Sequence, residues 1–147
     1  MNTQPLVVKF VYPVESSLVW DALTDKEKMR KWYFDMDDFK AVPGFAFRFS
    51  AKTEKDIIYV HHCVVTEVIP GKKLAYSWRY EGYPGNSHLS FELSEESGGV
   101  GLKLTHSGLE SFADNGPDFA VSSFQEGWNY ILGKSLPDFL ETNSVAV

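Results

Sequence analysis

Residues 118–141, DFAVSSFQEGWNYILGKSLPDFLE, predict one long amphipathic helix in a chain that otherwise consists mostly of short strands. A one-sided stripe recurs along it at spacings of three or four residues: Phe124, Trp128, Ile131, Leu132, Ser135 and Phe139. Polar residues such as Glu126 and Lys134 take the other side. Such a helix needs an apolar surface to cover, and the strands before it favour a curved antiparallel sheet that grips it.

Two prolines bear on this helix. Pro117 suits a first helical turn, where its missing N–H costs nothing. Pro137 lies inside the helical pattern and predicts a kink or break near residues 134–136. The ends of the chain, residues 1–5 and 142–147, are expected to be frayed.

Alternation of apolar with polar residues indicates the strands. A first strand spans Leu6–Val11 and is stopped by Pro13, and a long one spans Ile57–Ile69, before the turn dipeptide Pro70-Gly71. The others are marked by alternating apolar or aromatic residues, namely Phe45, Phe47 and Phe49; Leu74, Tyr76, Trp78 and Tyr80; Leu89, Phe91 and Leu93; and Leu102, Leu104 and His106. Residues 108–116 are predicted to form a loop.

Two short helices are predicted after the first strand. Ser16 or Ser17 can cap one that runs through Leu23, and Thr24 with Glu27 has capping-box spacing for another that runs from Asp25 to Trp32 or Tyr33. The fold class is therefore α+β, with an antiparallel sheet of six or seven strands around the C-terminal helix.

Length and composition restrict the class of protein. The 147 residues, 44% of them hydrophobic, predict one domain spanning 1–147. The net charge of −6 and the dispersed basic residues argue against a nucleic-acid partner. No signal peptide is visible at the N-terminus, and no apolar run reaches the roughly 18 residues of a membrane span, so a cytoplasmic protein is expected.

Several short motifs in a fixed order and spacing carry a family resemblance. They are Tyr12-Pro13-Val14-Glu15, Val19-Trp20-Asp21-Ala22-Leu23-Thr24-Asp25, Lys31-Trp32, Glu67-Val68-Ile69-Pro70-Gly71-Lys72-Lys73-Leu74-Ala75-Tyr76-Ser77-Trp78, Leu104-Thr105-His106-Ser107-Gly108-Leu109, Gly127-Trp128 and Ser135-Leu136. Together they resemble the heat-shock protein 90 ATPase activator homologue family, within the SRPBCC superfamily of helix-grip domains that includes START lipid-transfer proteins and birch-pollen allergens. The resemblance implies the helix-grip fold and a link to the stress response.

Catalytic, cofactor and metal signatures are missing from the sequence. It has no Gly-rich phosphate loop, no helical zinc-ligand histidine pair and no serine nucleophile elbow, so no catalytic residue, cofactor or metal site is predicted. Cys63 lies in a strand and is interpreted as a small buried hydrophobe. His61 and His62 point to opposite faces of one strand, and the sequence does not say which faces inward. His106 shares the parity of Leu102 and Leu104 and is expected inside.

Aromatic residues gather on the face predicted to point toward the helix. Composition alone leaves open whether these rings fill a core or wall a cavity. The predicted cavity is lined by Trp32, Phe45, Phe47, Tyr76, Trp78, Phe91, His106, Phe124, Trp128 and Leu132. Tyr76 and Trp78 would add polar tips to its apolar wall.

Three classes of function are compatible with this sequence. The favoured one is non-catalytic binding of an apolar or lipid-like small molecule between sheet and helix, by a monomer or homodimer. The second is binding of a protein partner such as a chaperone, although the eukaryotic activators carry an additional N-terminal domain for which 147 residues leave no space. The third is a cyclase- or hydrolase-like enzyme, for which His106 and one of His61 or His62 are the acid-base candidates.

Overall fold

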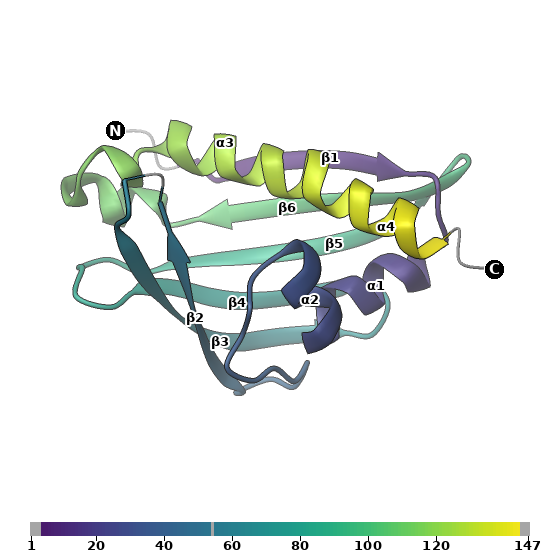
Figure 1. Cartoon of the computed structure of the whole chain (residues 1–147), viewed down its shortest axis with the longest axis horizontal. Coiled ribbons are helices and arrows are strands. Elements are labelled where there is room, and N and C mark those ends of the chain that lie inside the picture. The colour runs from purple at the N-terminus through teal and green to yellow at the C-terminus, as the bar shows by residue number, and fades with distance from the viewer. Residues whose placement is uncertain (1–3, 54, 145–147) are drawn as a thin grey trace.

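The computed structural model describes residues 4–53 and 55–144, with side chains as far as Glu141. Six strands form one antiparallel sheet in the order β1-β6-β5-β4-β3-β2, which confirms the predicted α+β class and strand number. Their bounds are β1 Leu6–Tyr12, β2 Ala46–Lys52, β3 Ile58–Ile69, β4 Lys73–Tyr80, β5 Ser87–Glu96 and β6 Gly99–Ser107. Figure 1 shows the sheet curving behind a long C-terminal helix that runs across β1 and β6.

Two short helices follow β1, as predicted. Helix α1 spans Ser16–Thr24 and helix α2 spans Lys26–Trp32. The predicted serine cap of α1 is wrong, because the helix begins at Ser16 and its N-cap residue is Glu15, whose side chain makes no capping hydrogen bond.

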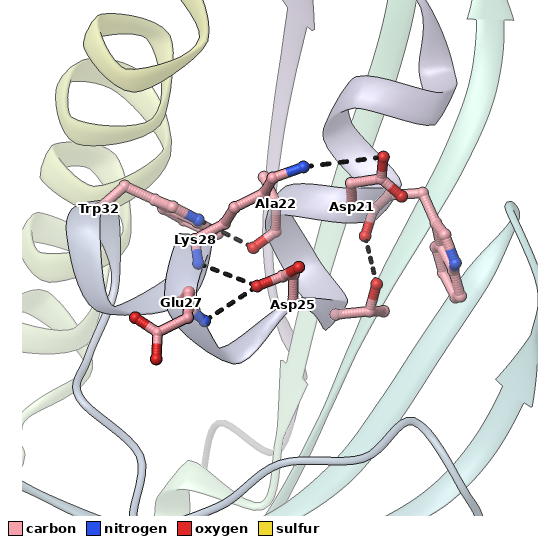
Figure 2. A network of polar contacts seen from close by, with 8 residues as sticks. Asp21, Ala22, Asp25, Glu27, Lys28 and Trp32 are labelled. Atoms are coloured by element: carbon pink, nitrogen blue, oxygen red, sulfur yellow. Dashed lines mark hydrogen bonds and ion pairs between the residues drawn. The ribbon is translucent and has the colours of Figure 1, made fainter. Parts of the chain in front are cut away.

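The predicted capping box of α2 is also wrong. The residue that caps this helix is Asp25, whose carboxylate accepts the backbone N–H groups of Glu27 and Lys28 at 2.9 and 3.2 Å. Thr24 cannot cap because it still belongs to α1 and donates its hydroxyl to the carbonyl of Trp20, one turn earlier. Figure 2 shows Asp25 between the two helices and the two contacts that link them: the Trp32 indole N–H donates to the Ala22 carbonyl, and the Lys28 ammonium group lies near the Asp21 carboxylate.

The C-terminal helix begins later than predicted. Pro117–Phe119 form a separate 3₁₀ turn, η2, and Ala120 is extended, so helix α3 spans Val121–Tyr130. Two features account for the separate turn. The carboxylate of Asp118 accepts a hydrogen bond of 2.8 Å from the Tyr59 hydroxyl, and the Phe119 side chain is buried.

The expected interruption near Pro137 takes the form of a π turn. This turn, η3, spans Ile131–Ser135 and leads into α4, Leu136–Ser144. A π turn contains one residue more than a turn of α-helix. The buried positions on either side of it are therefore four residues apart, without the usual alternation of three and four. The stripe therefore ends on Leu136 and Leu140, whereas Ser135 and Phe139, predicted to lie in it, are only half-buried.

Two further segments differ from the sequence predictions. The predicted loop at residues 108–116 contains a 3₁₀ helix, η1 Leu109–Asn115, because Phe112 packs fully into the core. At the C-terminal end of the chain, α4 continues to Ser144, so residues 142–144 of the tail expected to be frayed are helical, while 1–3 and 145–147 lie outside the described residues.

The core lies between the concave face of the sheet and the C-terminal helix. It is closed at one end by α1 and α2 and at the other by η1 and η2 (Figure 1). Among the helices of the described chain, none is both long enough and apolar enough to cross a membrane.

Candidate functional site

The floor of the candidate site is strand β4, where every second side chain faces the long helix. Tyr76 is fully buried and Trp78 is 4% exposed, as the alternation along this strand predicts. Both polar tips bind other side chains of the protein. The Tyr76 hydroxyl lies 2.7 Å from the hydroxyl of Tyr33, and the Trp78 indole N–H donates to the Tyr80 hydroxyl at 2.9 Å.

A buried chain of hydrogen bonds links the helix to the sheet. The Trp128 indole N–H of α3 donates to Nδ1 of His106 on β6, at 3.1 Å. Because Nδ1 accepts this bond, the neutral ring carries its hydrogen on Nε2, which donates to Ser87 Oγ at 2.9 Å. The Ser87 hydroxyl in turn donates to the carbonyl of Trp78 at 2.8 Å. Both nitrogens of His106 are therefore engaged.

Burial sets the protonation of the two inward histidines. Desolvation lowers the pKa of His106 to about 3 and that of His61 to about 4, because neither site can solvate an imidazolium ion. His61 is the inward member of the His61-His62 pair, stacked on Phe49 with ring centroids 4.3 Å apart. His62 lies on the other face beside Glu81, with 3.1 Å between Nε2 and the carboxylate oxygen. The sequence alone did not settle this choice.

Most of the predicted lining residues come together. The Trp78 and Trp128 ring centroids are 5.6 Å apart, and those of Phe91 and Trp128 are 6.0 Å apart. Phe124 lies 5.4 Å from the His106 ring. Phe47 contacts Tyr76 at 5.1 Å from the β2 side, and Leu132 is fully buried beneath the helix. In this structure the rings touch one another.

Two predicted lining residues lie at the margin. Phe45 precedes β2, is half-buried and contacts only one other aromatic ring, that of Phe39, among the described residues. Trp32 is buried at the end of α2, where its indole N–H donates to the carbonyl of Ala22 at 2.9 Å, as Figure 2 shows. Its carbonyl accepts the Ser135 hydroxyl, which ties the end of α2 to the π turn.

Two aromatic residues outside the predicted lining lie inside the site. Tyr33 stacks on Trp128 with ring centroids 6.2 Å apart, and Phe34 stacks on Phe49 at 4.4 Å. They begin the segment 33–45, which contains no helix or strand. In the sequence they stand out only as two adjacent aromatic residues directly after a helix. Two adjacent residues form no repeating pattern, so the sequence does not indicate which way their side chains point.

Neither metal nor thiol chemistry is supported by the described side chains. No group of three or more potential metal-ligating side chains comes together within the part of the chain that the structure describes. Cys63 is 1% exposed, and burial raises the pKa of its thiol well above the ordinary value, as the interpretation of a small buried hydrophobe predicts.

The comparisons with known proteins agree with this architecture. A family model described as activator of Hsp90 ATPase homolog 1-like protein matches residues 13–141. The chain belongs to this family. The Hsp90-activator-like assignment confirms the resemblance drawn from the sequence motifs. A search of curated proteins found no similar sequence.

Solved structures share the fold of this Hsp90-activator-like domain. CV1439 from Chromobacterium violaceum is 21% identical with a TM-score of 0.79, over 94% of this chain and 97% of its own. CalU16 from Micromonospora echinospora is 23% identical with a TM-score of 0.72, over 92% and 75%. DynU16, from the dynemicin biosynthetic locus, is 20% identical with a TM-score of 0.79 over 97% of this chain, which spans only 49% of the DynU16 chain.

Proposed function

We propose that this protein binds an uncharged, mostly apolar small molecule between the concave face of the sheet and helix α3, without catalysing a reaction. The observation that carries the proposal is the continuous aromatic surface shared by sheet and helix, centred on Trp78, Phe91 and Trp128. Large apolar walls with a few placed polar groups are typical of small-molecule sites.

The charge of the interior favours a neutral ligand. Among the described residues the buried polar side chains are His61, Ser87 and His106, and each forms a hydrogen bond. In the part of the chain that the structure describes, no carboxylate, lysine or arginine is buried with them. A charged ligand would lose its hydration without gaining a counter-charge, at a cost of several kcal/mol.

The hydrogen-bond pattern argues against acid-base catalysis by His106. A general base needs a free lone pair, and the lone pair of its neutral ring accepts the Trp128 N–H. A general acid needs a pKa near the working pH, whereas burial lowers the pKa of His106 to about 3. His61 shares the second of these defects, because burial lowers its pKa to about 4.

The relatives add circumstantial support for small-molecule binding. DynU16 belongs to a biosynthetic locus, which is a setting where a protein that holds a small molecule is useful. At 20% identity this likeness carries the fold alone, so the proposal rests on the aromatic site of the present chain.

Native mass spectrometry of the purified protein, followed by a thermal-shift panel, tests the proposal. The panel holds fatty acids, two-ring aromatics and polyketide-like compounds, and each is also scored for product formation. A bound ligand raises the melting temperature by mass action. We expect shifts without products. Product formation that disappears in His106→Ala would support an enzyme. If no compound gives a thermal shift or a product, and the protein captures a chaperone, partner binding would be supported.

A further inference from the structure

The Tyr33 side chain lies where a ligand ring would stack. Building on the proposed function, we infer that Tyr33 occupies the ligand position and that the ligand is a planar neutral aromatic with a hydroxyl or carbonyl oxygen, which replaces the Tyr33 hydroxyl on Tyr76.

The position of the Tyr33 ring supports this inference. It lies between the helix and the sheet, parallel to the Trp128 indole within 25°, with centroids 6.2 Å apart. On the sheet side it meets Phe91 edge-on at 84° and 6.4 Å. These are the contacts that a planar aromatic ligand would make in a site walled by rings, with stacking on one wall and an edge contact on the other.

The hydroxyl pair supplies the polar part of the inference. Tyr33 and Tyr76 share one hydrogen bond of 2.7 Å, in which either can be the donor. Two hydroxyls carry two hydrogens, so one hydrogen of the pair finds no acceptor among the described residues. A ligand oxygen that takes the place of the Tyr33 hydroxyl would accept the single hydrogen of the Tyr76 hydroxyl, and the hydrogen of Tyr33 would leave with its side chain.

The two tyrosines differ in how firmly they are held. Tyr76 is fully buried on β4, in the middle of the sheet. Tyr33 is half-buried and follows directly on the end of α2. Tyr76 is therefore the fixed partner, and Tyr33 is the one that can be displaced.

The chain on both sides of Tyr33 is anchored, so displacement does not require unfolding. Before it, the Trp32 indole is bound to Ala22 (Figure 2). After it, Asp37 is bound to β2, where its carboxylate accepts the Arg48 N–H at 3.0 Å and its own N–H donates to the Arg48 carbonyl at 3.1 Å. The rearrangement that would let the ring leave is then confined to residues 33–36, a segment that includes the buried Met36.

The surroundings also select a neutral ligand oxygen. Burial raises the pKa of both hydroxyls, Tyr33 and Tyr76, well above the usual 10.0. The same enclosure would penalise a phenolate or carboxylate on the ligand, because one hydroxyl donor cannot replace its hydration.

Titration calorimetry with 2-naphthol and naphthalene, a pair that differs by one hydroxyl, tests the inference. Wild type, Tyr33→Ala, Tyr33→Leu and Tyr76→Phe are compared, with Tyr130→Ala as the control because Tyr130 is 63% exposed on the same helix as Trp128. Tyr33→Leu keeps an apolar filler in case Tyr33→Ala does not fold.

Removing a side chain that occupies the site should strengthen binding, whereas removing an ordinary lining residue should weaken it. We expect Tyr33→Ala or Tyr33→Leu to bind 2-naphthol at least about fivefold more tightly than wild type, because the competing occupant is gone. Tyr76→Phe should reduce the preference for 2-naphthol over naphthalene by about three- to tenfold, the worth of one neutral hydrogen bond. Tyr130→Ala should match wild type.

Failure of the Tyr33 inference and failure of the proposed function give different results. If both compounds bind wild type but the Tyr33 variants bind no more tightly, or Tyr76→Phe keeps the preference, the inference is overturned and the proposed site survives. If neither compound binds wild type or a folded Tyr33 variant, the inference is overturned and the proposed function fails for aromatic ligands as well.

Discussion

The indole N–H of Trp128 donates to Nδ1 of His106 across 3.1 Å, joining the long helix to strand β6 inside the core. The bond sets the tautomer of the imidazole and leaves its Nε2–H to donate to Ser87. Protonation of Nδ1 would set two N–H donors against each other. The imidazole is thus held neutral by both burial and geometry.

This arrangement predicts a loss of stability in mild acid. In the unfolded chain a histidine has a pKa near 6.5, whereas in the folded chain the pKa of His106 is about 3. Below pH 6.5 the unfolded state therefore binds the proton first, and stability falls as the pH falls toward 3. His61, with a folded pKa of about 4, acts in the same direction. Each should cost roughly 1.4 kcal/mol per pH unit.

Urea unfolding of wild type and His106→Gln between pH 6.5 and 5, above the main carboxylate titrations, measures this effect. Glutamine can accept from Trp128 and donate to Ser87 without titrating. The variant should show a shallower loss of unfolding free energy than wild type. Parallel pH curves would mean that the pKa of His106 is not lowered in the folded state.

Replacement of Trp128 tests the packing of the helix. Trp128 is 3% exposed, so Trp128→Ala should lower the unfolding free energy by roughly 3–5 kcal/mol. Tyr130→Ala, two residues further along α3 and 63% exposed, is the matched control and should change it by less than about 1 kcal/mol. A loss below about 1 kcal/mol for Trp128→Ala would place this ring outside the core.

The hydroxyl pair predicts non-additive stability changes. Tyr33→Phe or Tyr76→Phe alone leaves the other buried hydroxyl without its partner, at a cost of roughly 1–3 kcal/mol. The double variant removes both polar groups, so its loss in urea unfolding should be clearly smaller than the sum of the single losses. Strict additivity would show that the two hydroxyls are not coupled.

The cap of α2 gives a local prediction. Asp25→Ala removes the acceptor of two backbone N–H groups and should cost about 1 kcal/mol in thermal or urea unfolding. Asp21→Ala is the control, because its 3.9 Å contact with Lys28 is exposed and contributes little (Figure 2). Equal losses in the two variants would contradict the assignment of Asp25 as the cap.

Regular periodicity explains which parts of the fold were predictable. Tyr76, Trp78 and Phe91 follow the two-residue alternation of strands, so their inward direction could be predicted from the sequence. The step of the helical stripe from Leu132 to Leu136 could not, because it depends on a π turn over Ile131–Ser135, which the regular helical period does not contain.

The parts of the site that could not be predicted depend on contacts distant in sequence. Tyr33 lies in a segment without period, and its partner Tyr76 is 43 residues away. The inward direction of His61 depends on the pairing of β3 with its neighbours, in particular the pairing of His61 with Tyr80. Sequence patterns fix faces within an element but carry no information on which segment fills the space between two elements.

The indole N–H signals of the four tryptophans, recorded by ¹⁵N NMR during titration with 2-naphthol, test the central claim most directly. Trp78 and Trp128 line the proposed site, whereas Trp20 lies on α1 and serves as an internal control. We predict saturable shifts of the Trp78 and Trp128 signals, with the Trp20 signal unmoved. Saturable shifts confined to Trp20, or no shift of any indole signal at saturating ligand, would contradict binding between the sheet and the long helix.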